Sequence, residues 1–306
     1  MKTMKSKFYS LALAAGMLTL TACSDDNTND SNNDKGNGIE NGSILKGTIT
    51  EDVTLKAGNT YKLSGEYIVE AGATLNIEEG VKIISVYDNI VDYILVKQGA
   101  KINAVGTPDK PIVMTSEKEE PGAWGGIHIC GKAHTNAEGG KGSSEIGGAV
   151  YGGNDDADNS GTLQYIRLEY TGFAFDEEHE ANGISFYGVG NGTIVDHCEA
   201  YKGSDDGFEF FGGSVNVSNM VVVSCSDDSF DWTEGWNGKG TDLVAYQEAK
   251  ATLGYDCDCL IEADNNENDN AATPVSHPVL KNLILAGNGE SKQGIRLRRG
   301  TQADID

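Results

Sequence analysis

The chain has 306 residues and a formal net charge of −24, with 47 acidic residues against 23 basic ones, and 40 of its residues are glycine. This charge excludes a nucleic-acid-binding protein, which needs basic clusters to neutralise phosphates. Apolar residues make up 38% and follow repeated patterns, which excludes a disordered chain. Abundant glycine with only five prolines is typical of many short strands joined by tight turns.

Residues 1–22 have the pattern of an export signal rather than of a folded segment. Three lysines precede an apolar run at 11–20 that is too short to span a bilayer. The run ends in Leu-Thr-Ala-Cys, which resembles the bacterial lipobox, and the resemblance implies that Cys23 is lipidated. Ser-Asp-Asp at 24–26 resembles the surface-export signal of Bacteroidetes lipoproteins. The implied location is the outer membrane, anchored through lipid at Cys23 and facing the cell surface.

The segment that follows the signal is expected to be a tether. Residues 23–44 are rich in Asp, Asn, Ser, Thr and Gly and offer almost nothing to bury. Such a composition predicts a flexible, acidic linker.

Repeats in the body of the chain decide its fold. The first family reads apolar, charged, any residue, Gly, two residues, then apolar-x-apolar, and it occurs at 55–63, 69–77 and 96–104. Each copy predicts a strand, a corner made with Gly, and another strand. The copies are 14 and 27 residues apart. We therefore interpret 45–135 as the β-rich capping coils at the N-terminal end of a solenoid.

The second family is more regular and combines two elements. One is a triplet with the spacing apolar-x-x-apolar-x-apolar, and the other is a short apolar-x-apolar strand; between their second and third copies both recur after 22 residues. The triplets begin at Leu163, Val195, Val217 and Leu280, and the short strands begin at Ile184, Phe208, Phe230, Ile261 and Ile295.

Alternation of apolar and polar residues within such short pieces predicts strands rather than helices. A coil of about 22 residues is one turn of a parallel β-helix, in which each coil buries its apolar face against its neighbours. A β-sandwich does not explain equivalent apolar positions at a constant offset. We therefore predict an all-β fold, a single-stranded right-handed parallel β-helix, whose coils in 136–306 continue from the capping coils.

Four further stretches resemble a family of β-helix lipoproteins from Bacteroidetes and marine bacteria. They lie at 123–127 (AWGGI), 154–161 (NDDADNSG), 204–213 (SDDGFEFFGG) and 228–232 (DSFDW). The resemblance extends from about Gly47 to the end of the chain. It implies a β-helix of the pectin-lyase-like superfamily, in a family whose function is mostly undefined. The His-Gly signature of the polygalacturonases is missing, so their activity is not implied.

Six carboxylates are expected to gather at one edge of two successive coils. The middle residues of the short strands form a column that reads Ser185, Glu209, Asp231, Glu262 and Arg296. The same 22-residue offset relates two pairs that precede the strands, Asp205-Asp206 and Asp227-Asp228. Adjacent coils lie about 4.8 Å apart, and like charges this close cannot all stay ionised without a partner.

Three roles stay open for these carboxylates. Calcium is a candidate cofactor, because it prefers oxygen ligands such as those of Asp205, Asp206, Asp227 and Asp228. The candidate catalytic groups are Glu209, Asp231, Asp206, Asp228 and Arg296. Carboxylates that accept backbone N–H groups at a corner are the structural alternative, since Asp-Asp-Gly is good turn chemistry. We expect Arg296 to compensate the negative charge of the acidic column rather than to act as a catalytic base.

A second candidate calcium site lies in a polar loop. Asp156, Asp158 and Ser160 have the spacing of the first ligands of a calcium loop, followed by Gly161. The twelfth position is Arg167 rather than the Glu that completes such loops. A solvated turn is the alternative.

The candidate ligand-binding residues are Trp236, Tyr246 and Glu262. Trp236 is expected to be an exposed platform for a sugar ring because it lies in a polar, Gly-rich loop. Trp232 occupies an inward position and is expected in the core. Cys198 also takes an inward position, and the pairing of the other cysteines cannot be read from the sequence.

The sequence thus favours a non-catalytic, cell-surface module that binds glycan or mediates adhesion, with acidic corners stabilised by a cation. The alternative is a polysaccharide lyase or glycoside hydrolase that uses the stacked carboxylates. Position distinguishes the two, because catalytic carboxylates must line an open groove, whereas structural ones are saturated by backbone N–H groups. The end of the chain reads like the start of another coil, so we expect a fragment that lacks its C-terminal coils.

Overall fold

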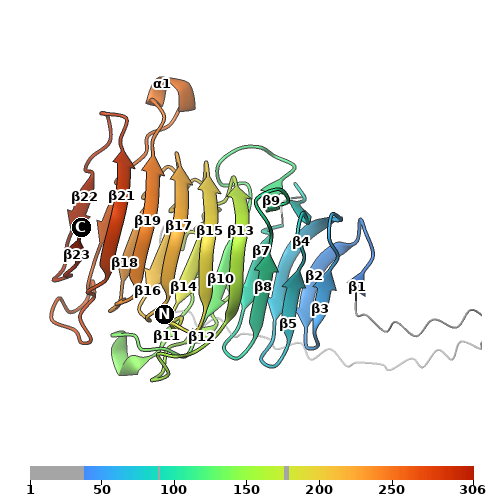
Figure 1. Ribbon diagram of the computed structural model, residues 1–306, viewed down its shortest axis with the longest axis horizontal. Coiled ribbons are helices and arrows are strands. Elements are labelled where there is room, and N and C mark those ends of the chain that lie inside the picture. Colours follow the sequence, from blue (N-terminus) through green and yellow to red (C-terminus); the bar gives the residue numbers. More distant parts are fainter. Residues whose placement is uncertain (1–37, 89, 176–178) are drawn as a thin grey trace, which may run out of the picture. The chain divides into compact units, whose positions relative to one another are not determined.

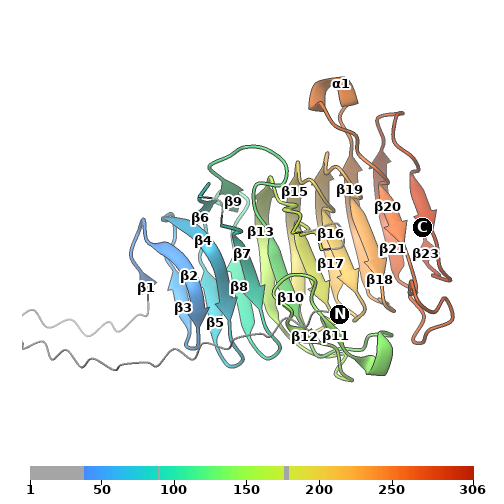
Figure 2. The same ribbon diagram turned by 180° about the vertical axis from the view of Figure 1, so that it is seen from behind.

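A computed structural model describes residues 38–88, 90–175 and 179–306, which form an all-β parallel β-helix. Twenty-one strands belong to one continuous sheet, and all their pairings are parallel. Figures 1 and 2 show the strands side by side from β1 to β23, in the order in which the coils follow one another. The predicted fold class is confirmed.

The strands pair in three ladders that run along the stack. The first ladder contains β1 (Gly38–Ile39), β3 (Val53–Leu55), β5 (Thr74–Ile77), β8 (Lys101–Val105), β13 (Gly161–Glu169), β15 (Ile194–Tyr201), β17 (Asn216–Val223), β19 (Lys239–Tyr246), β21 (Val279–Ala286) and β23 (Asp304–Ile305). The second ladder contains β2 (Ile44–Ile49), β4 (Thr60–Val69), β6 (Lys82–Ser85) and β9 (Ile112–Ser116), and it joins the second half of β13.

The third ladder carries the site described below. It leads from the second half of β4 to β7 (Tyr93–Val96), β10 (Ile127–Cys130), β14 (Ile184–Tyr187), β16 (Phe208–Phe211), β18 (Phe230–Thr233), β20 (Ile261–Ala263) and β22 (Ile295–Leu297). The remaining elements are the antiparallel hairpin of β11 (Gly142–Ser143) and β12 (Val150–Tyr151), the 3₁₀ turn η1 (Glu138–Gly140) and the short helix α1 (Lys250–Leu253). No helix among the described residues has the length and apolar composition to cross a membrane.

Residues in the left-handed conformation explain the two-residue gap in the apolar triplets. One residue of each gap has a positive φ between 50° and 58°, and these residues are Tyr165, His197, Asn219, Asp242 and Asn282. The bend lets the apolar residues on both sides of the gap face the interior although two residues separate them. The chain therefore turns from one face of the β-helix to the next within a single long strand.

The interior is a continuous apolar core built from the predicted inward positions. Trp232 and Cys198 are each 1% exposed, as the sequence predicts. One copy of the triplet does not match the sequence pattern, because its first position is Gly240, which has no side chain. Gly240 pairs with Val217 on one side and with Leu280 on the other. The side chains of Leu243 and Leu280 fill the space that a larger residue would occupy. A Cβ atom at Gly240 would lie only 2.8 Å from atoms of each of them.

The last residues of the predicted tether belong to strands of the sheet. Ile39 lies within the expected tether at 23–44, yet it pairs with Leu55 and packs against the core. The predicted signal peptide at 1–22 and Cys23 lie outside the described residues. Between the predicted capping coils and those after residue 135, the sheet continues without a break, because β8 and β9 both pair with β13.

Candidate functional site

The corner that precedes the third-ladder strands contains a row of side chains that accept backbone N–H groups. Asn182 Oδ1 accepts the N–H of Asp206 at 3.2 Å, and Asp206 Oδ1 accepts the N–H of Asp228 at 2.8 Å. Asp228 Oδ1 in turn accepts the N–H of Cys259 at 2.6 Å. Each side chain thus ties its own coil to the next one. Asp206 and Asp228 thereby meet the structural criterion stated for these carboxylates.

A second acidic row lies beside this one and contains Asp205, Asp227 and Asp258. Oxygen atoms of Asp205, Asp206 and Asp227 lie within 4.8 Å of one another, and the same holds for Asp227, Asp228 and Asp258. Burial raises the pKa of Asp228 to about 8, and burial together with neighbouring carboxylates raises the pKa of Asp205 and of Asp206 well above the ordinary range. The predicted crowding of carboxylates at this corner therefore exists. Lys292, which bonds Asp258, brings a positive charge to one end of the row.

The predicted column on the strands is in register. Ser185 pairs with Glu209, Glu209 with Asp231, and, further along, Glu262 with Arg296. Asn182 Nδ2 donates to Glu209 Oε2 at 2.7 Å. Asp231 Oδ1 is shielded from solvent and accepts no hydrogen bond from the described part of the chain. Oxygen atoms of Asp206, Glu209 and Asp231 lie within 4.8 Å of one another.

A second outward row lies two residues further along each strand. It contains Tyr187, Phe211 and Thr233, which are in register. Asp264 takes the equivalent position directly after β20, and Arg298 takes it directly after β22. The rings of Tyr187 and Phe211 are stacked with their centroids 4.4 Å apart. An aromatic strip therefore lies beside Glu209 and Asp231.

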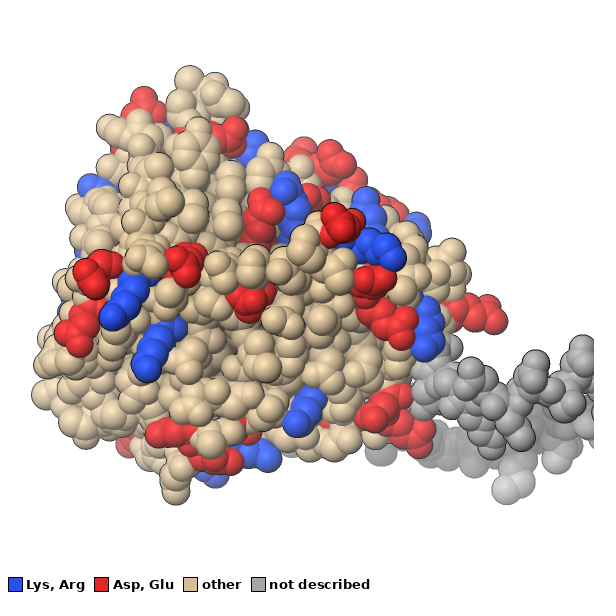
Figure 3. Space-filling model, in the orientation of Figure 1, with Lys and Arg blue, Asp and Glu red and all other residues tan. Residues whose placement is uncertain are grey.

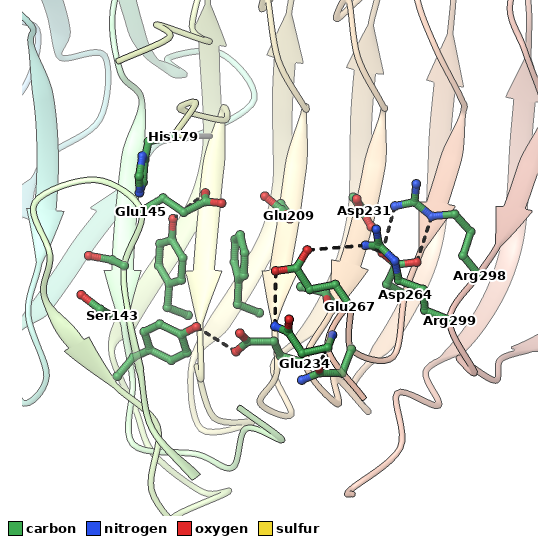
Figure 4. A pocket seen from close by; sticks show the side chains of 17 residues that line it. Ser143, Glu145, His179, Glu209, Asp231, Glu234, Asp264, Glu267, Arg298 and Arg299 are labelled. Carbon is green, nitrogen blue, oxygen red and sulfur yellow. Dashed lines mark hydrogen bonds and ion pairs between the residues drawn. The ribbon is translucent and has the colours of Figure 1, made fainter. Parts of the chain in front are cut away.

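These two rows form the floor of a cavity of about 730 Å³. Figure 4 shows Glu145 and His179 at one side of it, Arg298 and Arg299 at the other, and Glu209 and Asp231 between them. The other lining residues are Ser143, Ser144, Tyr151, Tyr187, Phe211, Thr233, Glu234, Asp264, Asn266, Glu267 and Asn268. The column residues Glu209 and Asp231 thus line an open space, which Asp206 and Asp228 do not.

Two insertions meet along one edge of the cavity. One lies between β10 and β13, where the backbone N–H of Asn136 donates to Glu234 O at 2.9 Å. The other lies between β20 and β21, where Asn265 Oδ1 accepts from Asn136 Nδ2 at 2.9 Å. Glu234 Oε2 also accepts from Tyr151 and Thr135, at 2.8 Å and 2.7 Å. This network fixes the wall from which Tyr151 and Glu234 face the cavity.

The arginines of the site are held by acidic neighbours. Arg298 forms a two-bond pair with Asp264, at 2.9 Å for each bond, and a further ion pair with Glu262. Arg299 donates to Asp264 at 2.6 Å, and Arg296 donates to Glu262 at 2.8 Å. Arg296 therefore compensates the acidic column and does not line the cavity.

The cavity contains carboxyl groups whose pKa values are raised. Burial raises the pKa of Glu145 to about 7, and it raises the pKa of Glu234 despite the two hydroxyl donors. Burial, followed by the charges of Glu145 and Asp231, raises the pKa of Glu209 well above its ordinary range. For Asp231, burial and Asp228 act in the same direction, and Arg298 opposes them. Burial is thus the main cause that raises the pKa of each of these four carboxyls.

The prediction of an exposed platform at Trp236 is wrong. Trp236 is 1% exposed, its ring stacks on Phe210 with centroids 4.1 Å apart, and its Nε1 donates to Val215 O. The Gly-rich loop turns the ring inward, because Glu234 and Gly235 both have a positive φ. Trp236 is a core residue.

The other ligand-binding and calcium candidates lie apart from the cavity. Tyr246 is exposed on β19, and Glu262 is 8% exposed and paired with arginine. Asp156 bonds His134 at 2.6 Å, and Asp158 accepts from Ser160 at 3.2 Å. The groups of three potential metal ligands found among the described residues do not include these loop residues.

Sequence reasoning missed most of the cavity walls, including Glu145, His179, Glu234 and Glu267. Glu145, His179 and Glu267 come from insertions that do not repeat, so no pattern points to them, and Glu234 directly follows β18, where the previous coil has Gly212. Asp264 could have been found, since it lies two residues after Glu262, just as Phe211 follows Glu209. Besides Cys198, the described cysteines are Cys130, Cys225, Cys257 and Cys259, and all five are buried and free.

Comparison with known families agrees with this architecture. Residues 47–306 match the model of the pectate-lyase-like β-helix domain. No curated protein matches the chain. The match covers most of the sequence, including the third ladder from β7 onward and the acidic column. The chain therefore belongs to the pectate-lyase-like β-helix family.

Proposed function

We propose that this protein binds a glycan in the cavity over β14, β16 and β18. One observation carries the proposal: the cavity places the Tyr187–Phe211 stack beside the carboxyl groups of Glu209 and Asp231. Sugar rings present hydroxyls that bond carboxyl groups, and the buried aromatic pair places an apolar surface beside these carboxyls. A volume of about 730 Å³ suits a ligand of a few sugar units.

Charge narrows the choice of glycan. Six acidic residues line the cavity, against the two arginines and His179. Both arginines already bond Asp264. A polyanionic glycan is therefore repelled, whereas a neutral or cationic one is not.

We also propose that the protein is anchored by lipid at Cys23 on the outer face of the outer membrane. The lipobox-like sequence and the acidic residues after it support this proposal. Figure 3 shows one face of the described chain, on which acidic and basic side chains lie in small mixed groups separated by wide uncharged areas. Metabolic labelling with a fatty-acid analogue tests the anchor: wild type should incorporate it and Cys23→Ala should not.

Calcium at the acidic corner is part of the proposal. Asp205, Asp206 and Asp227 offer clustered carboxylate oxygens, the ligand type that Ca²⁺ prefers. Asp206 and Asp228 still each offer the oxygen that does not accept a backbone N–H group. A bound cation would offset the burial and the mutual repulsion that raise the pKa of these carboxyls.

Glycoside hydrolysis is a second candidate function, favoured by the position of two carboxyls. Glu209 and Asp231 line the same cavity with oxygens within 4.8 Å of each other. Retaining glycosidases place their two carboxyls about 5–5.5 Å apart and inverting ones about 6.5–9.5 Å apart, so the retaining geometry is nearer. A lyase reaction is less well supported, because the arginines that could act as base are engaged by Glu262 and Asp264.

A glycan array followed by a degradation assay tests both functions. Wild type should bind at least one neutral or amine-bearing glycan, and Glu209→Gln should weaken that binding. Tyr246→Ala is the matched control, because Tyr246 is exposed and outside the cavity. Release of reducing ends that stops in Glu209→Gln and in Asp231→Asn would establish hydrolysis. Release that persists in both variants contradicts it, and no binding to any glycan contradicts the proposed function itself.

A further inference from the structure

We infer that the ligand of this cavity carries an ammonium group, which lies against Glu209 and Asp231 beside the Tyr187–Phe211 stack. The inference rests on the proposed function and narrows it to a chemical class, an amine-bearing glycan. It follows from the partners of the two carboxyls, from the aromatic strip and from the charge of the surrounding walls.

The first argument is that neither carboxyl has a cationic partner in the described part of the chain. Glu209 is bonded by the neutral amide of Asn182, at 2.7 Å. Asp231 lines the cavity, and its shielded Oδ1 accepts no hydrogen bond. Because Oδ1 is closed off from the cavity, a ligand meets this carboxyl at its other oxygen. A cationic group there would pair with a carboxyl to which no basic side chain of the described residues is bonded.

The second argument is that the nearby arginines cannot provide that partner. Arg298 lies close enough to Asp231 to oppose the rise in its pKa that burial and neighbouring carboxylates cause. Its guanidinium, however, is bonded by both oxygens of Asp264 and paired with Glu262. Arg299 is bonded by Asp264 as well. A movement of either arginine toward Asp231 would break an existing buried pair, which is costly.

The third argument is the chemistry of the floor. An ammonium group forms strong, charge-assisted hydrogen bonds with carboxylates, and a neighbouring apolar surface that excludes water strengthens them. Tyr187 and Phe211 are the second-row neighbours of Ser185 and Glu209 on β14 and β16. Their rings stack on each other and are at most 7% exposed, so they form an apolar surface beside the column. A neutral hydroxyl would use the hydrogen-bonding capacity of the site but not its charge.

The charged groups around Glu209 and Asp231 add to the attraction for a cation. They are Glu145 from one wall, with His179 beside it, Asp205, Asp206 and Asp228 from the corner, and Glu262, Asp264 and Arg298 from the following coils. Acidic groups outnumber basic ones among them, so a positive charge is attracted to this part of the cavity.

Calorimetry with matched oligosaccharides tests the inference on the full-length chain. The probes are glucosamine oligomers, their N-acetylated counterparts of equal length, and N,N,N-trimethylated oligomers whose charge does not change with pH. We expect both cationic series to bind at least about tenfold more tightly than the acetylated one, because a hydrogen bond or contact to a charged group is worth more than a neutral one. For the trimethylated series, affinity should fall with added salt.

Variants and two further probes separate the outcomes. Glu209→Gln should remove most of the cationic preference, and Asp242→Asn, an exposed carboxyl outside the cavity, should leave it unchanged. Acetylated oligomers that bind as tightly as cationic ones overturn the inference and leave glycan binding intact. If spermidine binds at Glu209 and no oligosaccharide of any series binds, the ammonium site is supported and the glycan function is contradicted. Binding of Ca²⁺ alone, or of no cationic probe, overturns the inference.

Discussion

Carboxylates at equivalent spacing take two different roles in this protein. Asp206 and Asp228 lie in the corner and accept the N–H of the following coil, whereas Glu209 and Asp231, three residues further on, line the cavity. The difference follows from side-chain direction, since the corner residues point along the stack and the column residues point away from it. Sequence offset alone cannot separate these roles.

Replacement of Asp228 tests the corner role. Asp228→Ala leaves the buried N–H of Cys259 without an acceptor, and it should lower the free energy of unfolding by about 1–3 kcal/mol. Asp228→Asn keeps an acceptor and removes a like charge, so it should be neutral or stabilising at pH 8. Urea denaturation of both variants measures the difference. An Asn variant as unstable as the Ala variant would show that the charge, not the acceptor, matters.

The bend residues offer a second test at this scale. Asp242 is exposed and has a φ of 58°, which a β-branched residue adopts only with strain. Asp242→Val should therefore cost about 1–2 kcal/mol of folding free energy, and Asp242→Gly should cost less or stabilise the chain. The control is the same two substitutions, to Val and to Gly, at Asp109, an exposed turn residue that does not have a positive φ. Equal costs for Val and Gly at Asp242 would argue against the bend as the constraint.

At the scale of the element, repeated strands were predictable and inserted segments were not. The apolar slots at a constant offset place Glu209 beside Asp231, and the pairing of β16 with β18 confirms that register. The cavity walls depend on Asn136, Glu145 and Glu267, which lie in insertions that occur once. Their positions follow from contacts between distant insertions, such as the bond between Asn136 and Asn265, and no local pattern encodes these contacts.

Trp236 shows how a turn can override composition. The loop around it is polar, which suggested an exposed ring, but the ring is buried against Phe210. Trp236→Ala should lower the free energy of unfolding by about 3–5 kcal/mol, because it leaves a large cavity in the core. Tyr246→Ala, at an exposed aromatic residue, should change it by about 0.5 kcal/mol or less. A small effect at Trp236, together with weaker glycan binding, would restore the role of a platform.

At the scale of the whole molecule, stacking brings acidic residues of successive coils together. The parallel ladders place equivalent residues of adjacent coils about 4.8 Å apart, so an acidic residue repeated in one position faces another of its kind. The stack therefore gains backbone hydrogen bonds and apolar burial at the cost of repulsion along its acidic rows. Burial and this repulsion together raise the pKa values of Asp205, Asp206 and Asp228.

This arrangement predicts an unusual dependence of stability on pH. A carboxyl whose pKa is higher in the folded chain than in the unfolded chain binds protons preferentially in the folded state, so stability falls as pH rises through that window. The window extends from about 4, the ordinary value, to about 8 for Asp228. Partly buried carboxyls with lowered pKa values, such as Asp196 and Glu78, lose their contribution only below this window. We expect the unfolding temperature to be about 5–10 °C higher at pH 5 than at pH 8.

Calcium should restore the stability that is lost at high pH, because it binds the corner carboxylates after they have lost their protons. Thermal unfolding at pH 8 should shift upward with added Ca²⁺, and the same addition at pH 5 should have little effect, since protons then occupy the oxygens. The double variant Asp206→Asn, Asp228→Asn should flatten both the pH profile and the calcium response, and NaCl at equal ionic strength is the control for screening. A chain that is more stable at pH 8 than at pH 5 without calcium would show that the acidic rows are already compensated within the fold. A calcium response that persists in the double variant would place the cation away from this corner.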